Sequence, residues 1–184
     1  RPKGTMLKAY PRMSFSVIIK GNSVINYRIE KKEAFRITGL RMNLETDMEN
    51  NFKNVPVFWT DKKKSEIFPE LCRLITPDLP KILGVTVYEN KENFYYYIAV
   101  KSNETLENTF EYTVPAATWV IFDSTGAAPE SIQKIYRQFY TEWLPTSGYE
   151  YGKAPEIEVY TDDDIKSHTY RSELWFPLKK EENN

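Results

Sequence analysis

The stretch EIEVYTDDDIKSHTYRSELWF, residues 156–176, contains the pattern that decides the fold. Its two ends, residues 156–160 and 170–176, have the extended pattern of strands. The polar run 161–164 predicts the tip of a hairpin between them. We therefore expect the chain to close on two paired strands.

A similar pair of strands occurs in the first half of the chain. LGVTVY at 83–88 can be laid over EIEVYT at 156–161, and FYYYIAV at 94–100 over YRSELWF at 170–176. In this alignment Tyr97 falls on Glu173. Each pair follows an earlier strand and a helical region, so both halves share the order strand, helix, strand, strand. The pattern indicates a weak internal duplication.

A duplicated unit of this order implies the α+β class, with a mostly antiparallel sheet and the helical segments on one face. It also implies a concave groove along the pseudo-two-fold seam between the units, and we expect a ligand to lie there. The remaining strands are expected at residues 15–19, 24–28, 34–40, 110–114 and 118–122, the first two as a hairpin.

Prolines define the expected helices. Region 51–74 is expected to hold two short helices, one opening near Pro56 and one near Pro69, because proline suits a first turn and breaks an interior. The clearest helix opens at Pro129, and we expect Pro145 and Gly148 to end it. Its continuous apolar face consists of Ile132, Ile135, Tyr136, Phe139, Tyr140 and Trp143.

Composition excludes several classes of protein. With 184 residues the chain is expected to form one domain. A net charge of -1 argues against a dedicated nucleic-acid binder. The absence of a run of about 18 apolar residues argues against a membrane span. Cys72 is the single cysteine, which rules out an internal disulfide and fits a cytoplasmic protein.

The sequence gives no support for a metal site, a cofactor or a catalytic triad. Cys72 and His168 are single residues far apart, without ligand spacing. The run Asp162 to Asp164 lacks the glycine and distal glutamate of a calcium loop. The seven glycines never cluster into a phosphate loop. We therefore expect no bound metal, no cofactor and no catalytic residue that the pattern alone identifies.

Glu173 is the one carboxylate inside an otherwise apolar strand. Strand alternation places Arg171, Glu173 and Trp175 on the same face. Burying an unpaired carboxylate costs several kcal/mol, so Glu173 needs a partner or a shifted pKa. The sequence leaves three possibilities open: an ion pair with Arg171, an exposed sheet edge, or the cation of a ligand.

Aromatic side chains pose the same choice between core and ligand. The chain has 13 Tyr, 10 Phe and 4 Trp, 15% of its residues. Several aromatic rings together can line a box for a cation, each contact contributing about 0.5–2 kcal/mol. They can equally fill the core. The candidates for a ligand pocket beside Glu173 are Trp59, Tyr96, Tyr97, Trp119, Trp143 and Trp175.

Several stretches of the sequence carry a resemblance to known families. The opening, LKAYPRMSFSVIIKG at 7–21 with YRIEKKEAFRITGL at 27–40, resembles the segment that joins the DNA-binding region of AraC-family transcription regulators to a C-terminal effector domain. The GyrI-like small-molecule-binding domain is resembled by PVFW at 56–59, FYYYIAV at 94–100, TVPAATWVIF at 113–122 and PEIEVY…YRSELWFPLKK at 155–180. The similarity covers nearly the whole chain.

The resemblance implies a fold and a pocket. GyrI-like domains consist of two pseudo-symmetric strand–helix–strand–strand units and bind hydrophobic, often cationic or aromatic compounds in the seam. The family's acidic residue on the last strand matches Glu173, its strand aromatic matches Trp119, and its helix tryptophan after a proline matches Trp59. These matches imply a ligand that stacks on the aromatic rings while Glu173 compensates its charge.

We expect residues 1–12 to be a linker to a missing N-terminal DNA-binding domain, residues 13–180 to be the effector-binding domain, and residues 181–184 to be a polar tail. The chain begins at Arg1 without a methionine, which favours an excised domain. The expected partners are a small aromatic or cationic molecule and, only through the missing domain, DNA, with no membrane. A homodimer stays open.

Two rival functions also stay open. Some GyrI-like proteins stand alone, and a subset hydrolyse reactive compounds with the same glutamate, so Glu173 could be a general base. A second rival is a module that inhibits a protein partner through its surface. The linker-like opening favours a sensor over an enzyme.

Overall fold

The computed structural model describes residues 14–19, 23–161 and 163–179. The helical elements are α1 (Met48–Lys63), α2 (Ile67–Arg73), α3 (Glu130–Gln138), the π-helix η1 (Phe139–Trp143) and α4 (Leu144–Ser147). The strands are β1 (Ser14–Ile19), β2 (Ser23–Lys32), β3 (Phe35–Asn43), β4 (Ile82–Tyr88), β5 (Phe94–Lys101), β6 (Phe110–Val114), β7 (Ala117–Thr125), β8 (Glu150–Tyr151), β9 (Glu156–Tyr160) and β10 (Arg171–Lys179). The predicted linker and C-terminal tail lie outside the described residues.

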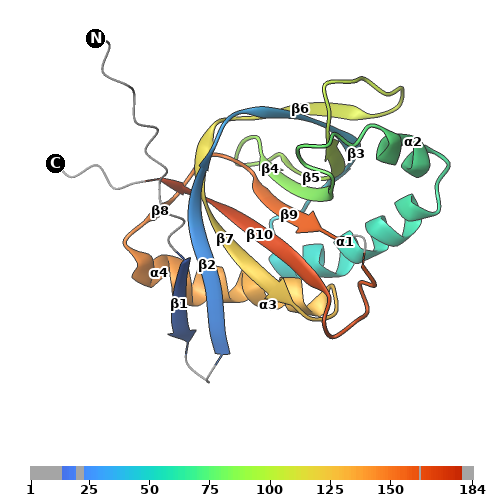
Figure 1. The fold of residues 1–184 in the computed structure, drawn as a ribbon. Helices are drawn as coiled ribbons and strands as arrows, with labels where there is room; N and C mark the ends of the chain where they lie inside the picture. The colour runs from blue at the N-terminus through green and yellow to red at the C-terminus, as the bar shows by residue number, and fades with distance from the viewer. Residues whose placement is uncertain (1–13, 20–22, 162, 180–184) are drawn as a thin grey trace, which may run out of the picture.

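The strands form one antiparallel sheet in the order β1-β2-β7-β10-β9-β4-β5-β3-β6, with β8 paired to the end of β10 (Figure 1). The six strands in the middle run β7-β10-β9 and then β4-β5-β3, so the second half mirrors the first about the β9–β4 pair. Each half has the order strand, helix, strand, strand. The α+β class and the duplicated unit predicted from sequence are therefore confirmed, and the β9–β4 pair is the seam.

The alignment that suggested the duplication is shifted by one residue in its first strand pair. In the ladder, Glu158 pairs with Gly84 and Glu156 with Thr86, so even-numbered residues of β4 and β9 share a face. The alignment of residue 83 with residue 156 therefore matches a residue on one face of the sheet with a residue on the other face. A one-residue shift reverses every side chain, because the period of a strand is two.

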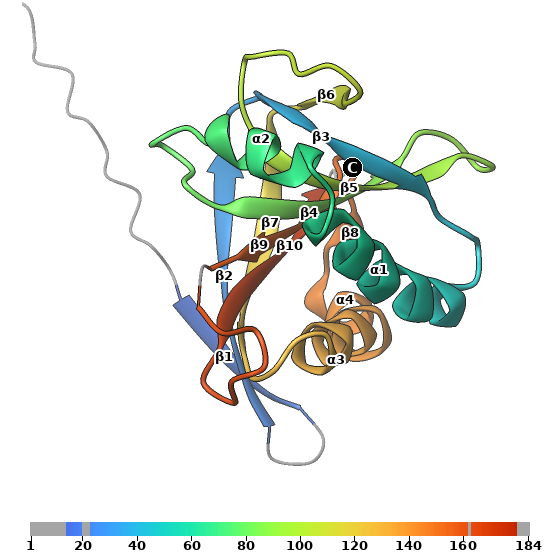
Figure 2. The same cartoon turned by 90° about the vertical axis from the view of Figure 1, so that its right-hand side faces the viewer.

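The sheet separates two cores. On the helix side, Phe122, Leu174 and Phe176 pack against α3 and η1. On the other side, one cluster contains Ile37 of β3 and Trp119 of β7, strands separated by four others in the sheet order. The sheet is therefore curled around this second core. Figure 2 shows α1 and α3 on the same side of the sheet, as the sequence predicts.

Helix α1 differs from the prediction. It begins at Met48, after the Asp47 N-cap, and contains Pro56 in its interior instead of opening there. Pro56 has no N–H for the carbonyl oxygen of Phe52, four residues earlier. Gln133 Nε2 of α3 donates to that oxygen at 2.8 Å. A side chain from the neighbouring helix thus replaces the missing backbone bond, which makes the interior proline tolerable.

The second helical region keeps its predicted start, its apolar face and its ending at Gly148, but Pro145 does not end it. Pro129 precedes α3, and Ile132, Ile135 and Tyr136 are buried. The chain then continues through η1 and α4 to Ser147, with Pro145 inside the first turn of α4. Gly148, at φ 75°, ends the helical path, because glycine adopts the left-handed backbone conformation more easily than other residues. Among the described residues, no helix is long and apolar enough to cross a membrane.

Candidate functional site

A pocket of about 380 Å³ lies at the seam, between the sheet and the two helices α1 and α3. We call it the seam pocket. Its walls are mainly aromatic and its floor is formed by the strands of the seam and their neighbour β5. The lining includes Phe52, Pro56 and Trp59 of α1; Ile132, Tyr136 and Tyr140 of α3 and η1; Thr86 and Tyr88 of β4; Tyr96 of β5; and Glu156, Glu158 and Tyr160 of β9.

Two carboxylates lie on the floor of this pocket. Glu156 and Glu158 are 2% and 5% exposed, whereas carboxylates are ordinarily found at the surface. They point to the same side because they are two residues apart in a strand, while Ile157 between them belongs to the core of the opposite face. The sequence EIEVY thus places two acids under the helices.

Glu158 is held by three phenols. Tyr96 donates to Oε2 at 2.7 Å, Tyr160 donates to the same oxygen, and Tyr136 donates to Oε1 at 3.2 Å. The indole of Trp59 extends the network, since its Nε1 donates to the Tyr96 hydroxyl at 2.8 Å. Gly84 is opposite Glu158 in the ladder, and a Cβ there would collide with Tyr96 Oη and Glu158 Oε2. This position therefore needs glycine.

Glu156 has a separate set of donors. Tyr140 and Tyr151 both donate to Oε1, Tyr151 at 2.8 Å. Within the described part of the chain, no donor is hydrogen-bonded to Oε2 of Glu156. Tyr140 belongs to the π-helix η1, a rare element that often occurs at functional sites.

Burial without a neighbouring cation shifts the titration of both acids. Burial raises the pKa of Glu156 to about 7; the hydrogen bonds from Tyr140 and Tyr151 lower it, and the charge of Glu158 adds to the rise. Burial also raises the pKa of Glu158, although its three phenols work against the shift. For the same reason the pKa of Tyr96 lies well above its ordinary value.

Of the residues proposed from sequence, the structure brings two into the seam pocket. Trp59 and Tyr96 line it, and the Trp59 ring packs edge-on against Tyr160 with centroids 4.9 Å apart. Trp143 belongs to the helix-side core and does not line the pocket. The other aromatic candidates, Tyr97, Trp119 and Trp175, are buried in the core on the opposite face of the sheet.

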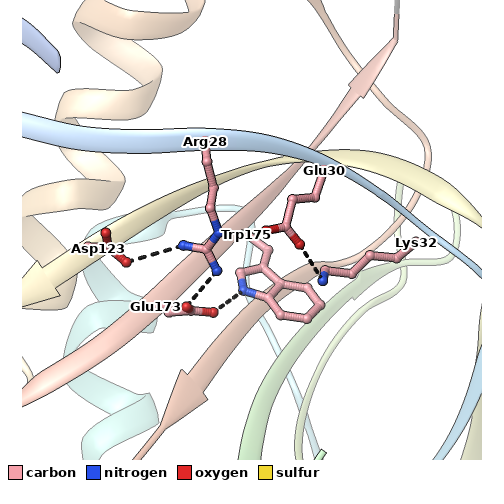
Figure 3. Close-up of polar contacts among 6 residues, drawn as sticks. All are labelled: Arg28, Glu30, Lys32, Asp123, Glu173 and Trp175. Atoms are coloured by element: carbon pink, nitrogen blue, oxygen red, sulfur yellow. Dashed lines mark hydrogen bonds and ion pairs between the residues drawn. The ribbon is translucent and has the colours of Figure 1, made fainter. Parts of the chain in front are cut away.

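Glu173 also lies on the opposite face (Figure 3). Arg28 Nη2 of β2 donates to its Oε1 at 2.6 Å, and Trp175 Nε1 donates to its Oε2 at 2.9 Å. The ion-pair partner is therefore Arg28, 145 residues earlier in the chain, and not Arg171.

The same guanidinium connects a larger group, which we call the Arg28 cluster. Arg28 donates through Nε to Glu30 at 2.7 Å and through Nη1 to Asp123 at 3.3 Å. Lys32 bonds Glu30 at 2.8 Å and lies 4.5 Å from the centre of the Trp175 ring. The cluster consists of Arg28, Glu30, Lys32, Asp123, Glu173 and Trp175.

Sequence reasoning missed the two acids of the pocket and most of their phenols. The missed residues are Glu156, Glu158, Tyr136, Tyr140, Tyr151 and Tyr160. The signal was present in the alternation Glu156, Glu158, Tyr160, which puts three polar groups on the face that the helices cover. Among the described residues, no group of three or more His, Cys, Asp and Glu side chains could hold a metal ion.

Several solved structures share this fold. SAV2435 bound to tetraphenylphosphonium matches with a TM-score of 0.75 and 22% identity over 83% of this chain and 93% of that one. The integron cassette protein VCH_CASS2 of Vibrio cholerae matches with a TM-score of 0.61 and 17% identity over 83% of this chain and 95% of that one. The EcmrR C-terminal domain matches with a TM-score of 0.57 and 18% identity over 85% of this chain and 98% of that one. A search of curated protein sequences found no significant match.

The curled antiparallel sheet, with helices on one face, is also the fold of SAV2435 and of the EcmrR C-terminal domain. Residues 28–178 match the family model of integron-associated effector-binding proteins, named Cass2. The chain belongs to this family, and the effector-binding domain predicted from sequence is confirmed.

Proposed function

We propose that this chain binds an apolar, aromatic cation in the seam pocket and serves as the ligand-sensing domain of a transcription regulator. The observation that carries the proposal is the pair Glu156 and Glu158: two buried carboxylates, under aromatic walls, that receive hydrogen bonds from phenols and from no cation of the described chain. A ligand cation would supply the missing charge.

The chemistry of the walls supports this ligand class. A charge of one sign in a low-dielectric site favours an ion of the opposite sign more strongly than it would in water. Indole and phenol rings attract cations by about 0.5–2 kcal/mol each. SAV2435, which has the same fold, was solved with the lipophilic cation tetraphenylphosphonium.

This proposal assigns charge compensation to Glu156 and Glu158 and not to Glu173. Glu173 already has a guanidinium at 2.6 Å and lies across the sheet from the pocket. A second cation at Glu173 would have to compete with Arg28, whereas the pocket acids have no such competitor in the described chain.

The regulator half of the proposal is supported by relatives and by the opening sequence. EcmrR, whose C-terminal domain has this fold, was solved in a complex with DNA. Residues 7–21 together with 27–40 resemble the segment that joins the DNA-binding and effector regions of AraC-family regulators. Ligand binding would then shift the orientation or association of an attached DNA-binding domain, by no more than its differential affinity for the two states.

Tetraphenylphosphonium and tetraphenylborate test the ligand class directly, because they have the same shape and opposite charge. Titration followed by tryptophan fluorescence is expected to show binding of the cation at least about tenfold tighter than of the anion. Equal affinities would contradict charge compensation. Absence of binding by the cation would contradict the ligand class.

A further inference from the structure

The two pocket acids, Glu156 and Glu158, occupy separate positions in the pocket and have separate hydrogen-bond donors. Residues two apart in a strand have Cα atoms about 6.6 Å apart, so the two carboxylates are neither one group nor distant ones. Glu158 receives Tyr96, Tyr136 and Tyr160, while Glu156 receives Tyr140 and Tyr151. No phenol is shared between the two sets. Each acid therefore has its own place along the floor of the pocket.

The surroundings provide little positive charge for two acids. From α1, Lys63 lines the pocket, but its Nζ lies over the Trp59 ring, 5.4 Å from the centroid. Lys166, from the segment between β9 and β10, is the other cation in the lining. Neither forms an ion pair with Glu156 or Glu158 among the described residues. The groups that face the acids from α3, η1, β4 and β5 are neutral: Tyr136, Tyr140, Tyr88 and Tyr96.

One positive charge cannot compensate both carboxylates on the floor of the pocket. A monocation beside either acid leaves the other as a buried charge, which must then bind a proton instead. A second positive centre on the same ligand would let both acids stay ionised. Oε2 of Glu156, which has no hydrogen-bond donor in the described chain, is the open acceptor for that second centre.

We propose that the seam pocket selects aromatic dications, with one cationic centre at Glu158 beneath Trp59 and the second at Oε2 of Glu156 beside Tyr140. This inference rests on the proposed function, since it specifies the ligand of the same pocket. It goes further by assigning a different role to each acid. It also fixes the spacing of the two ligand charges at about the 6.6 Å that separates residues two apart in a strand.

A matched ligand pair tests the inference. (4-Methylbenzyl)trimethylammonium and para-xylylene-bis(trimethylammonium) share one aromatic ring and carry one and two cationic centres. In wild-type protein, calorimetry at low ionic strength is expected to show at least about tenfold tighter binding of the dication. Glu156→Gln and Glu158→Gln, which keep the acceptor oxygen for the phenols, are each expected to reduce this preference to less than about twofold.

The control is Glu92→Gln, which removes one negative charge from the exposed turn between β4 and β5. It is expected to leave the dication preference unchanged. A similar reduction in Glu92→Gln would mean that overall charge and not the pocket makes the difference, and would overturn the inference.

A measurement on wild-type protein alone covers the case in which a variant does not fold. Titrations at pH 6 in two buffers of different ionisation enthalpy give the number of protons released on binding. The dication is expected to release more protons than the monocation, because it ionises both acids. Equal affinity and equal proton release for the two ligands would overturn the dication inference and leave the proposed function standing, whereas failure of both ligands and of tetraphenylphosphonium to bind would overturn the proposed function.

Discussion

Two acidic sites lie back to back in this molecule, on neighbouring strands and on opposite faces of the sheet. Glu173 of β10 pairs in the ladder with Val159 of β9, next to Glu158, and the two carboxylates point away from each other. Glu173 accepts from the guanidinium of Arg28 at 2.6 Å. Glu158 accepts from Tyr96 at 2.7 Å and from two further phenols.

The two sites differ in their counter-ions: Glu173 has one within the chain, whereas Glu158 has none among the described residues. In the Arg28 cluster each of the three acids, Glu30, Asp123 and Glu173, has a cation of the same chain within 3.3 Å, so every acid there has a counter-ion. Phenols satisfy the hydrogen-bonding capacity of Glu158 but not its charge. An acid in this second situation favours either a proton or a foreign cation. The seam pocket is therefore the site where binding a ligand changes the electrostatics most.

The largest expected effect is on the pH dependence of stability. Glu156 has a folded pKa of about 7, above the ordinary value of 4.5, so its protonated form is favoured in the folded state. Its contribution is fully present below pH 4.5 and is lost as the pH rises through 7. We expect the free energy of unfolding to fall by up to about 3 kcal/mol between pH 5 and pH 8.

Urea denaturation of wild-type protein and Glu156→Gln at both pH values measures this contribution. The variant cannot ionise at this position, so its decrease between pH 5 and pH 8 is expected to be clearly smaller. The raised pKa of Glu158 leaves part of the slope in place. An identical slope in the two proteins would show that Glu156 is not held in its acid form.

The next largest effect concerns tetraphenylphosphonium. Replacing both pocket acids, Glu156→Gln with Glu158→Gln, is expected to weaken its binding about a hundredfold at pH 8, since neither position can then supply a carboxylate to compensate the cation. Glu173→Gln is expected to change the affinity less than about twofold, because its carboxylate lies across the sheet beside Arg28. Fluorescence titration of the two variants compares the acidic sites directly. A larger loss in Glu173→Gln would reverse the assignment.

Stability separates the two sites in the opposite sense. Arg28→Met leaves Glu173 with the Trp175 indole as its remaining donor among the described residues. We expect a loss of about 1–2 kcal/mol, below the range for deeply buried pairs, because the side chains of Arg28 and Glu173 are 23% and 31% exposed. Thermal or urea denaturation measures it. The double variant Arg28→Met with Glu173→Gln is expected to recover part of the loss. A double variant less stable than Arg28→Met would contradict an ion pair between them.

The sequence predicts most of the strands, several of them from a period-two pattern, and the mirrored order of the two halves follows from their similarity. It could not decide which face of β10 meets the helices. Both faces of this sheet are covered, one by helices and the other by the curl of the sheet, so apolar residues occupy both sides of β10. Trp175 and Leu174 are both buried, on opposite faces.

The hydrogen-bond and ion-pair partners of the acids could not be predicted from local sequence patterns either. Arg28 is 145 residues from Glu173, and nothing near either residue indicates the pairing. Glu156 and Glu158, by contrast, alternate with Ile157 and Val159 in a way that is typical of an exposed strand face. Only the position of β9 at the centre of the sheet, under α3, shows that this polar face is buried.

The smallest expected effect concerns the bond that joins the two helices above the pocket. Gln133 donates to the Phe52 carbonyl that Pro56 leaves without an N–H. Gln133→Leu is expected to cost about 1 kcal/mol of unfolding free energy, since it leaves that carbonyl unpaired. In a Pro56→Ala background the residue 56 N–H can donate to Phe52, so the same substitution should cost about half as much or less. Denaturation of the four proteins gives the coupling energy, and a coupling near zero would mean that Gln133 does not replace the missing helical bond.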